Sequence, residues 1–388
     1  MKKLLLNLAL IAATSVTSLH AVTLCQSPAP RTASPRTLAP TSSRIITPAD
    51  TCIQYVGRIS LQHPERPLFN YPGAQINVAF EGTWLRMLCK PQSGFFMAQI
   101  DDSEPFKVSF TGRRDSVVTL CTALPEGRHT ARLMYCIEGW DLKPEFRGFI
   151  TDGHLVAPPA LPQRRIEFIG NSITCGYGNE ANDQNEHYSY ETQNHYYSYA
   201  QIAARQLGAV ASVCARSGIG AYRNYNGPRT GTPDNRMDVQ YEYTMYAEKS
   251  GFRNEGGAMN ERWDFARFRP DVVCMNLGTN DLSTNNYDTR LLKQGYQKLL
   301  GMIRQHNPQA KIVLLTGTML QGKELQICRQ LLDEVTDEAH QRGDSEVYRF
   351  DMSPQGALGY GADWHPSLAQ HQKMADELTA YLRQLMQW

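Results

Sequence analysis

Apolar segments alternate with helical segments along the second half of the 388-residue chain, and this alternation restricts the fold more than any other feature. The helical segments have apolar residues on one face, and segment 271–277 is almost wholly apolar, as a parallel strand covered on both faces requires. The pattern predicts an α/β domain over 159–388, with a flavodoxin-like, doubly wound parallel sheet. The expected strands are 166–169, 210–215, 271–277, 311–316 and 347–351, and the expected helices are 197–207, 290–305, 325–341 and 369–386.

The first half has a different pattern, with short apolar segments separated by turn residues such as Pro-Gly and Glu-Gly. No segment of about 12 residues in it shows helical periodicity. We therefore predict an antiparallel, jelly-roll-like β-sandwich over 49–158. The sequence has no aromatic cluster that marks a sugar site here, and structural support is the favoured role. The expected strands are 75–80, 83–89, 94–100, 106–110, 116–120 and 130–137.

The N-terminus is typical of an export signal. Met-Lys-Lys precedes an apolar run over 4–13 that is too short to span a bilayer, and small residues follow up to Ala21. We expect a signal peptide over 1–21, a flexible linker over 22–48 that is rich in Pro, Ser and Thr, and a periplasmic or extracellular protein. No other apolar run is long enough for a membrane span.

Charge and motifs argue against several classes of function. The net charge of +1 offers no electrostatic footprint for nucleic acid. No Cys-x-x-Cys pair suggests zinc, and Arg223 replaces the third glycine of a dinucleotide fingerprint. We therefore expect no zinc site and no bound dinucleotide. The nine cysteines lie mostly in apolar segments, where a free thiol packs as a small hydrophobic group.

Ser172 directly follows the first predicted strand of the α/β domain, after Gly170 and Asn171. This position exposes a hydroxyl at the carboxyl edge of a sheet, where open α/β folds bind ligands. The alternative is that Ser172 only caps a helix.

Three later residues also lie at predicted strand ends, namely Gly218, Asn280 and His365. A histidine can take the proton of a serine hydroxyl. The backbone N–H groups of Ser172 and Gly218 and the Asn280 amide could stabilise an oxyanion. Taken singly, the three could be a turn glycine, a loop residue and a surface histidine, but together they predict a catalytic site.

With these four blocks the second half resembles the SGNH (GDSL-like) hydrolases, which contribute Ser, Gly, Asn and His in this order. The chain from about residue 50 is most similar to carbohydrate esterase family 2, acetyl esterases with an N-terminal β-sandwich. The blocks are Gly-Asn-Ser-Ile-Thr-Cys-Gly-Tyr-Gly, Ser-Gly-x-Gly-x-Tyr-Arg-Asn, Gly-Thr-Asn-Asp and Asp-Trp-His-Pro. The resemblance implies removal of acetyl groups from plant cell-wall polysaccharides or oligosaccharides of the xylan or mannan type, without metal or cofactor.

Two positions depart from the family pattern. Asn171 stands where many members have Asp, and Ala362 stands where the third member of the triad is expected, three residues before the histidine. We therefore predict a Ser172–His365 dyad whose imidazole Nδ1–H is held by a backbone carbonyl or another acceptor. The alternative is that Asp363, one residue nearer, orients the histidine.

Aromatic residues beside the blocks suggest how a sugar ring could bind. Trp364, Tyr177 and Tyr222 are candidate substrate contacts, and for the two tyrosines core packing is an equal alternative. The polar insertion 221–262 is long for a strand-to-helix connection, and such loops are often functional. Two rival functions remain: an esterase or thioesterase for lipid or acyl substrates, and a carbohydrate-binding protein with a degenerate esterase site.

Overall fold

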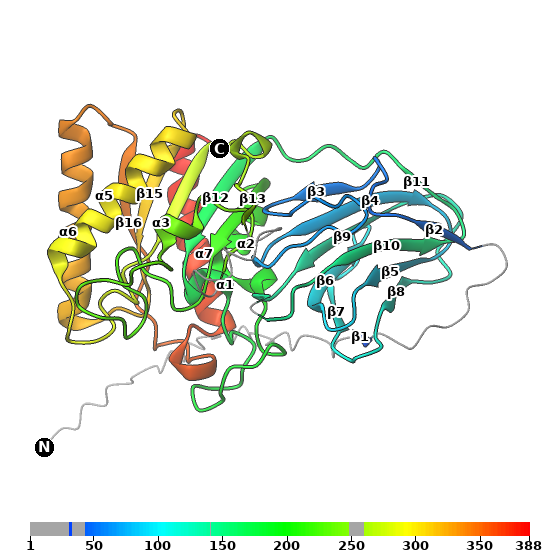
Figure 1. The fold of residues 1–388 in the computed structure, drawn as a ribbon, viewed down its shortest axis with the longest axis horizontal. Coiled ribbons are helices and arrows are strands. Elements are labelled where there is room, and N and C mark those ends of the chain that lie inside the picture. Colours follow the sequence, from blue (N-terminus) through cyan, green and yellow to red (C-terminus); the bar gives the residue numbers. More distant parts are fainter. Residues whose placement is uncertain (1–30, 33–42, 140, 248–259) are drawn as a thin grey trace, which may run out of the picture.

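The computed structural model describes residues 31–32, 43–139, 141–247 and 260–388. The expected signal peptide and most of the expected linker lie outside these residues. The described chain forms a β-rich part followed by an α/β part, and the two lie side by side (Figure 1). In the part that the model describes, no helix combines the length and the apolar character needed to cross a membrane.

The β-rich part is a sandwich of two sheets with a shared apolar core. Pairing within both sheets is antiparallel, except that β1 runs parallel to β7. The larger sheet contains β1 (Arg31–Thr32), β3 (Gln54–Val56), β4 (Gln75–Glu81), β6 (Gly94–Ile100), β7 (Phe106–Phe110), β9 (Arg128–Tyr135) and β11 (His154–Val156). The smaller sheet contains β2 (Arg44–Ile46), β5 (Leu85–Cys89), β8 (Val117–Cys121) and β10 (Phe146–Thr151).

The structure corrects the boundary of the sandwich. Residues 31–32 and 44–46, which the sequence analysis assigned to the linker, form β1 and β2 and pair with β7 and β10. Strands β3, β10 and β11 were also not predicted. These strands are short or interrupted, as at the bulge between Phe146 and Gly148, so their local pattern is weak and their partners define them.

The α/β part has the predicted doubly wound architecture. Its five parallel strands follow the order β13-β12-β14-β15-β16, which is the flavodoxin-like order 2-1-3-4-5. The strands are β12 (Arg164–Gly170), β13 (Ala209–Ala215), β14 (Val272–Asn276), β15 (Lys311–Thr316) and β16 (Val347–Asp351).

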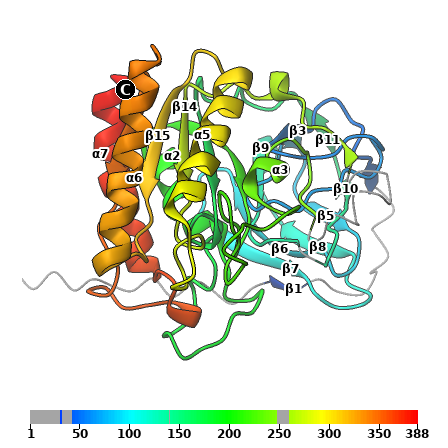
Figure 2. The same ribbon diagram turned by 60° about the vertical axis from the view of Figure 1, so that its left-hand side comes forward.

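Helices cover both faces of this sheet (Figures 1 and 2). Side chains of α5 (Thr289–His306) and α6 (Gly322–Gln341) share one core cluster with alternate strand residues such as Met275 and Leu314. Side chains of α2 (Tyr199–Gln206) and α7 (Leu368–Met386) share a second cluster with the strand residues that face the other way, such as Phe168 and Val313. The shorter helices are α1 (Ser172–Cys175), α3 (Met237–Gln240), η1 (His195–Tyr197), η3 (Phe265–Arg267) and η4 (Ala362–Trp364).

A buried arginine joins the two parts. Arg58 of the sandwich is 1% exposed, and its guanidinium donates to the carbonyls of Tyr241 and Tyr243 at 2.6 and 2.8 Å and pairs with Glu167 at 3.2 Å. Tyr241 and Tyr243 belong to the insertion 221–262. Its described residues near α3 therefore pack between the parts, whereas 248–259 lie outside the described residues.

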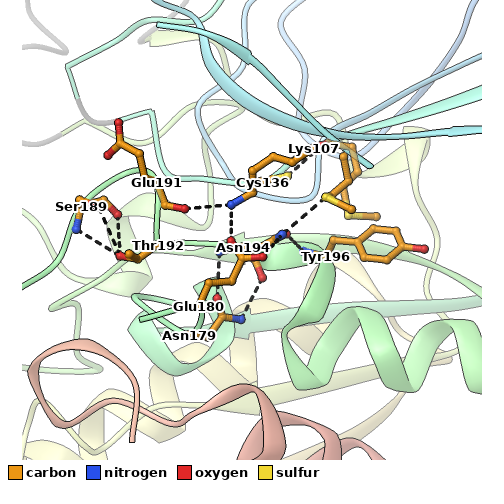
Figure 3. A network of polar contacts seen from close by, with 11 residues as sticks. Lys107, Cys136, Asn179, Glu180, Ser189, Glu191, Thr192, Asn194 and Tyr196 are labelled. Atoms are coloured by element: carbon orange, nitrogen blue, oxygen red, sulfur yellow. Dashed lines mark hydrogen bonds and ion pairs between the residues drawn. The ribbon is translucent and has the colours of Figure 1, made fainter. Parts of the chain in front are cut away.

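A second polar network ties the sandwich to the loop that follows α1 (Figure 3). Lys107 of β7 forms an ion pair with Glu180 and donates to the carbonyl of Glu191 at 2.9 Å. The Asn194 amide donates to Glu180 at 2.8 Å, and Asn194 and Asn179 exchange two further hydrogen bonds of 2.9 Å. The sandwich thus contacts the segment adjoining Ser172.

Candidate active site

The structure places Ser172 in a sharp turn at the carboxyl end of β12. Asn171 is the N-cap of α1, because its side-chain oxygen accepts the N–H of Ile173 at 3.0 Å, so the alternative that Ser172 is the cap is wrong. A Cβ on Gly170 would lie 2.0 Å from the Thr174 hydroxyl, which explains the glycine before the turn. The Ser172 side chain is consequently free to point into a pocket, and the residue is 6% exposed.

The structure brings His365 to Ser172. Nε2 of His365 lies 2.9 Å from Ser172 Oγ, and Nδ1 lies 3.2 Å from the carbonyl oxygens of both Ala362 and Asp363. Carbonyls can only accept, so Nδ1 carries the proton and Nε2 is left to accept from the serine hydroxyl. Burial lowers the pKa of His365 to about 4, against the opposing effect of the two carbonyls.

The carboxylate of Asp363 points elsewhere. It accepts hydrogen bonds from the Tyr177 hydroxyl at 3.0 Å, the Tyr188 N–H at 3.0 Å and His187 Nδ1 at 2.9 Å. Although burial acts in the opposite direction, these donors hold the pKa of Asp363 below its ordinary value. Asp363 has a positive φ of 49°, which turns its side chain away while its carbonyl faces the imidazole. Only the main chain of Asp363 contacts His365.

Gly218 and Asn280 lie on neighbouring loops of the same pocket. Gly218 has a φ of 75°, a left-handed conformation that favours glycine, and its surroundings leave room for a Cβ. The Asn280 amide donates one hydrogen to the carbonyl of Ile219 at 2.7 Å. An amide nitrogen carries a second hydrogen, and Asn280 lines the pocket together with Ser172.

Two buried carboxylates that were not predicted as site residues hold these loops. Asp281 accepts N–H groups of Gly278, Ala221, Tyr222 and Arg223 at 2.9 to 3.2 Å, and burial raises its pKa against the effect of these donors. Asp281 follows Asn280 in the third block, so the sequence motif could have identified Asp281 as a residue of the site.

Glu138 belongs to the sandwich and accepts from the N–H and hydroxyl of Ser217 at 2.6 and 2.5 Å. Ser217 precedes Gly218, so a side chain of the first part holds a loop of the site. No local pattern marks Glu138, which is 79 positions away in the chain.

The predicted aromatic contacts have three different surroundings. The ring of Tyr177 lies between His365, at a centroid distance of 4.1 Å, and Tyr188, at 4.3 Å, so both of its faces are covered. Tyr222 is 5% exposed and packs in the core, which is the core-packing alternative that the sequence analysis left open. Trp364 is 56% exposed, but its ring packs near Tyr360 and does not line the pocket.

The pocket at Ser172 has a volume of about 920 Å³ and is open to solvent. Its walls combine hydroxyl, amide and carboxylate groups with a few apolar side chains. Tyr225, from the polar insertion, is one of the lining residues. In the described part of the chain no group of three or more His, Cys, Asp and Glu residues could hold a metal ion. The pocket is lined by Ser172, Tyr177, Ser217, Gly218, Tyr225, Thr279, Asn280, Leu282, Ser283, Asn285, Met319, Leu320, Gln321, Glu324, Asp363 and His365.

Two family models match the chain. The model described as carbohydrate esterase 2 N-terminal matches residues 55–159, and the GDSL-like Lipase/Acylhydrolase family matches residues 168–373. The chain is similar to a family two carbohydrate esterase from Clostridium thermocellum whose structure contains cellohexaose. The two are 37% identical with a TM-score of 0.77, over 87% of this chain and 99% of that one.

Curated relatives give the same picture. The chain is 36% identical to the cellulase/esterase CelE of Acetivibrio thermocellus over 87% of its own length, but spans only 40% of that protein. It is 28% identical to an acetylxylan esterase / glucomannan deacetylase of Cellvibrio japonicus, over 89% of this chain and 92% of the relative.

Proposed function

Since the chain belongs to carbohydrate esterase family 2, within the GDSL-like hydrolases, we propose that it removes acetyl groups from plant cell-wall polysaccharides or their oligosaccharides. The family makes the chain a carbohydrate esterase and a carboxylic ester hydrolase. The observation that carries the proposal is the 2.9 Å contact between Ser172 Oγ and His365 Nε2, in a pocket that Gly218 and Asn280 also line.

In the proposed reaction, Ser172 Oγ attacks the acetyl carbonyl carbon while His365 Nε2 takes the hydroxyl proton. The carbonyl oxygen becomes an oxyanion, which accepts hydrogen bonds from the N–H groups of Ser172 and Gly218 and the Asn280 amide. The Nδ1–H bonds to the Ala362 and Asp363 carbonyls keep the imidazole in the required tautomer.

Collapse of this intermediate breaks the bond to the sugar oxygen, which receives the proton from His365 Nε2, and an acetyl–Ser172 ester remains. A water molecule then attacks the ester carbonyl as His365 takes one of its protons. When the second tetrahedral intermediate collapses, the proton returns from His365 to Ser172 Oγ and acetic acid leaves, which ionises to acetate in solution. Every proton transfer uses one nitrogen, so the dyad requires no metal or cofactor.

The proposal is tested by acetate release from acetylated xylan, glucomannan and pectin, measured side by side. We expect release from the xylan or the glucomannan. A parallel panel of 4-nitrophenyl esters addresses the lipid or acyl alternative, since an acetyl esterase loses rate sharply beyond two or three acyl carbons. Equal rates on acetyl and long-chain esters would contradict the proposal.

The catalytic pair is tested by substitution. We expect Ser172→Ala and His365→Ala each to lower kcat by about 10³ or more, and the double variant to be scarcely worse, since residues that act as a unit are not additive. Circular dichroism provides the folding control. If either variant keeps a tenth of the activity, the mechanism is wrong. If the native protein releases no acetate but binds oligosaccharides, the binding-protein alternative holds.

We also propose that the protein is exported, on the basis of the basic and apolar N-terminal sequence. N-terminal sequencing of the mature protein recovered from its source cells tests this. Cleavage after Ala21 is expected, whereas a cytoplasmic protein that begins at Met1 would contradict export.

A further inference from the structure

A second pocket lies at the other end of the parallel sheet from Ser172. It has a volume of about 460 Å³. One wall is the outer face of the larger sandwich sheet, and the other is formed by residues 159–162, α2 and the start of β13. Ser172 follows the carboxyl end of β12, whereas this pocket borders Gly208 and Ala209 at the amino end of β13. The two pockets share no lining residue. We call this second space the interdomain pocket.

A row of polar side chains crosses four neighbouring strands at its floor. Gln54 of β3 lies opposite Asn77 of β4, Asn77 lies opposite Arg132 of β9, and Arg132 lies opposite Gln99 of β6. Residues in register on adjacent strands point to the same face of a sheet. All four residues accordingly line the interdomain pocket.

These side chains satisfy one another poorly. The Asn77–Gln54 and Arg132–Gln99 contacts both measure 3.5 Å, beyond the usual range of a protein hydrogen bond. Asn77 is only 9% exposed, and its Oδ1 has no hydrogen-bond partner among the described residues. A buried acceptor of this kind requires a donor from outside the chain, which a water molecule or a ligand can supply. The row is therefore compatible with a ligand whose hydroxyl groups replace water at these amides.

The charge of the pocket is one-sided. Arg132 and Arg205 line it, whereas no Asp or Glu does, and neither arginine makes an ion pair with a carboxylate in the described ranges. Arg205 is held on the wall opposite the row, because its guanidinium lies 3.8 Å from the Tyr196 ring centroid and donates to the Tyr196 carbonyl at 2.8 Å. A guanidinium that is not already paired with a carboxylate is well matched to a carboxylate on a ligand.

We propose that the interdomain pocket binds a saccharide that carries a carboxylate, such as a uronic acid unit on an oligosaccharide. Arg132 binds the carboxylate, and the amides of Gln54, Asn77 and Gln99 pair with ring hydroxyls, since amide and hydroxyl groups each both donate and accept. Binding is non-covalent and independent of the reaction at Ser172. The sandwich thereby holds acidic, branched chains at a distance from the site of hydrolysis.

Isothermal titration of the Ser172→Ala protein tests the proposal with two ligands of four sugar units each: xylotriose bearing one glucuronic acid, and neutral xylotetraose. We expect the acidic ligand to bind at least tenfold more tightly, and Arg132→Gln to remove that preference. Gln99→Ala should weaken binding of the acidic ligand less than Arg132→Gln does. Arg113→Gln is the matched control, because Arg113 lies in the turn between β7 and β8 and lines no part of the pocket.

The proposal is overturned if the two ligands bind equally, if neither binds at millimolar concentration, or if Arg132→Gln binds the acidic ligand as the parent does. Inhibition of 4-nitrophenyl acetate hydrolysis by the native protein shows whether the acidic ligand binds at Ser172 or elsewhere. We expect no inhibition at a saturating concentration of the acidic ligand, whereas competitive inhibition would place it at Ser172 and reject the interdomain pocket. If the native protein lacks esterase activity, the proposed function fails, and the titrations still decide this proposal.

Discussion

At the scale of single residues, the position of His365 depends on main-chain atoms. The two carbonyls that face Nδ1 belong to η4, where Asp363 and Trp364 have φ values of 49° and 64°. Non-glycine residues adopt this region rarely, and such strain is retained where the surroundings enforce it. Three hydrogen bonds to the Asp363 carboxylate supply that enforcement. A carboxylate that makes no hydrogen bond to the imidazole thus helps to hold it in place.

The pH dependence of activity follows from the lowered pKa of His365. The imidazole must be unprotonated to act as a base, and its pKa in the folded protein is about 4 instead of the ordinary 6.5. We therefore expect kcat/KM for 4-nitrophenyl acetate to remain level from pH 8 down to about pH 5 and to fall only as the pH approaches that pKa. Circular dichroism over the same range is the control for unfolding. An acidic limb centred at 6.5 or higher would contradict this.

The role of Asp363 separates a dyad from a triad. Because its carboxylate does not touch the imidazole, Asp363→Asn should lower kcat by about tenfold at most, through loosening of the loop. Replacing a triad carboxylate by its amide lowers kcat by about 10⁴. Initial rates and thermal melting of the purified variant check this. A folded variant slowed a thousandfold would make Asp363 the third catalytic residue.

At the scale of secondary-structure elements, the loops after β13 and β14 form one unit around the Asp281 carboxylate. Asp281 accepts two N–H groups on each of its oxygens, three from the β13 loop and one from its own. The Asn280 amide adds a direct bond to Ile219. Donors from two strand ends are therefore held at fixed spacing before a substrate arrives, which is the condition for stabilising an oxyanion.

Asn280→Ala removes one donor from this unit while Asp281 continues to hold the loops. We expect kcat to fall by about 10² to 10³, the effect of losing a single oxyanion donor, with a much smaller change in KM. Steady-state kinetics on an acetylated oligosaccharide measure both constants. A normal kcat with a tenfold higher KM would show that Asn280 binds the ground state.

At the scale of the whole molecule, the sandwich is part of the architecture of the site. Glu138 holds Ser217 next to Gly218 in the loop after β13, Lys107 binds the segment after α1, and Arg58 anchors the insertion near α3. These contacts are buried and charge-assisted, and breaking one leaves an uncompensated charge or donor. The catalytic loops consequently depend on both parts of the chain.

Glu138→Gln tests this dependence. The substitution keeps the shape of the side chain but places an amide N–H₂ against the donors of Ser217. We expect kcat to fall by roughly 10- to 100-fold, since a hydrogen bond to a charged group contributes about 1.5–3 kcal/mol. The matched control is Asn70→Ala, which removes the contacts of Asn70 with Tyr246 at 2.8 and 3.1 Å.

The control should lower the melting temperature and leave kcat nearly unchanged, because Asn70 contacts the insertion and not the oxyanion loop. Equal loss of kcat in both variants would mean that the interface acts through general stability. An unchanged kcat in Glu138→Gln would remove its positioning role.

The sequence by itself determined the fold class and the set of strand-end residues. Apolar periodicity is a local property, so the parallel strands and their helices were predicted to within a few residues of their ends. Three of the four blocks follow strand ends and the fourth precedes the last helix, and the carboxyl ends of parallel strands meet at one edge. The meeting of Ser172 with His365 could therefore be anticipated across 193 positions.

Only the tertiary structure decided how the site is supported. The direction of the Asp363 carboxylate depends on His187 and Tyr188, which lie 176 and 175 positions away, and on a backbone angle that composition does not reveal. The sequence missed Glu138 and left the role of Tyr222 undecided for the same reason, since burial and hydrogen-bond partners arise from packing between distant segments. Strand periodicity depends on residues that are neighbours in the sequence, whereas hydrogen-bond partners depend on which distant segments the complete fold brings together.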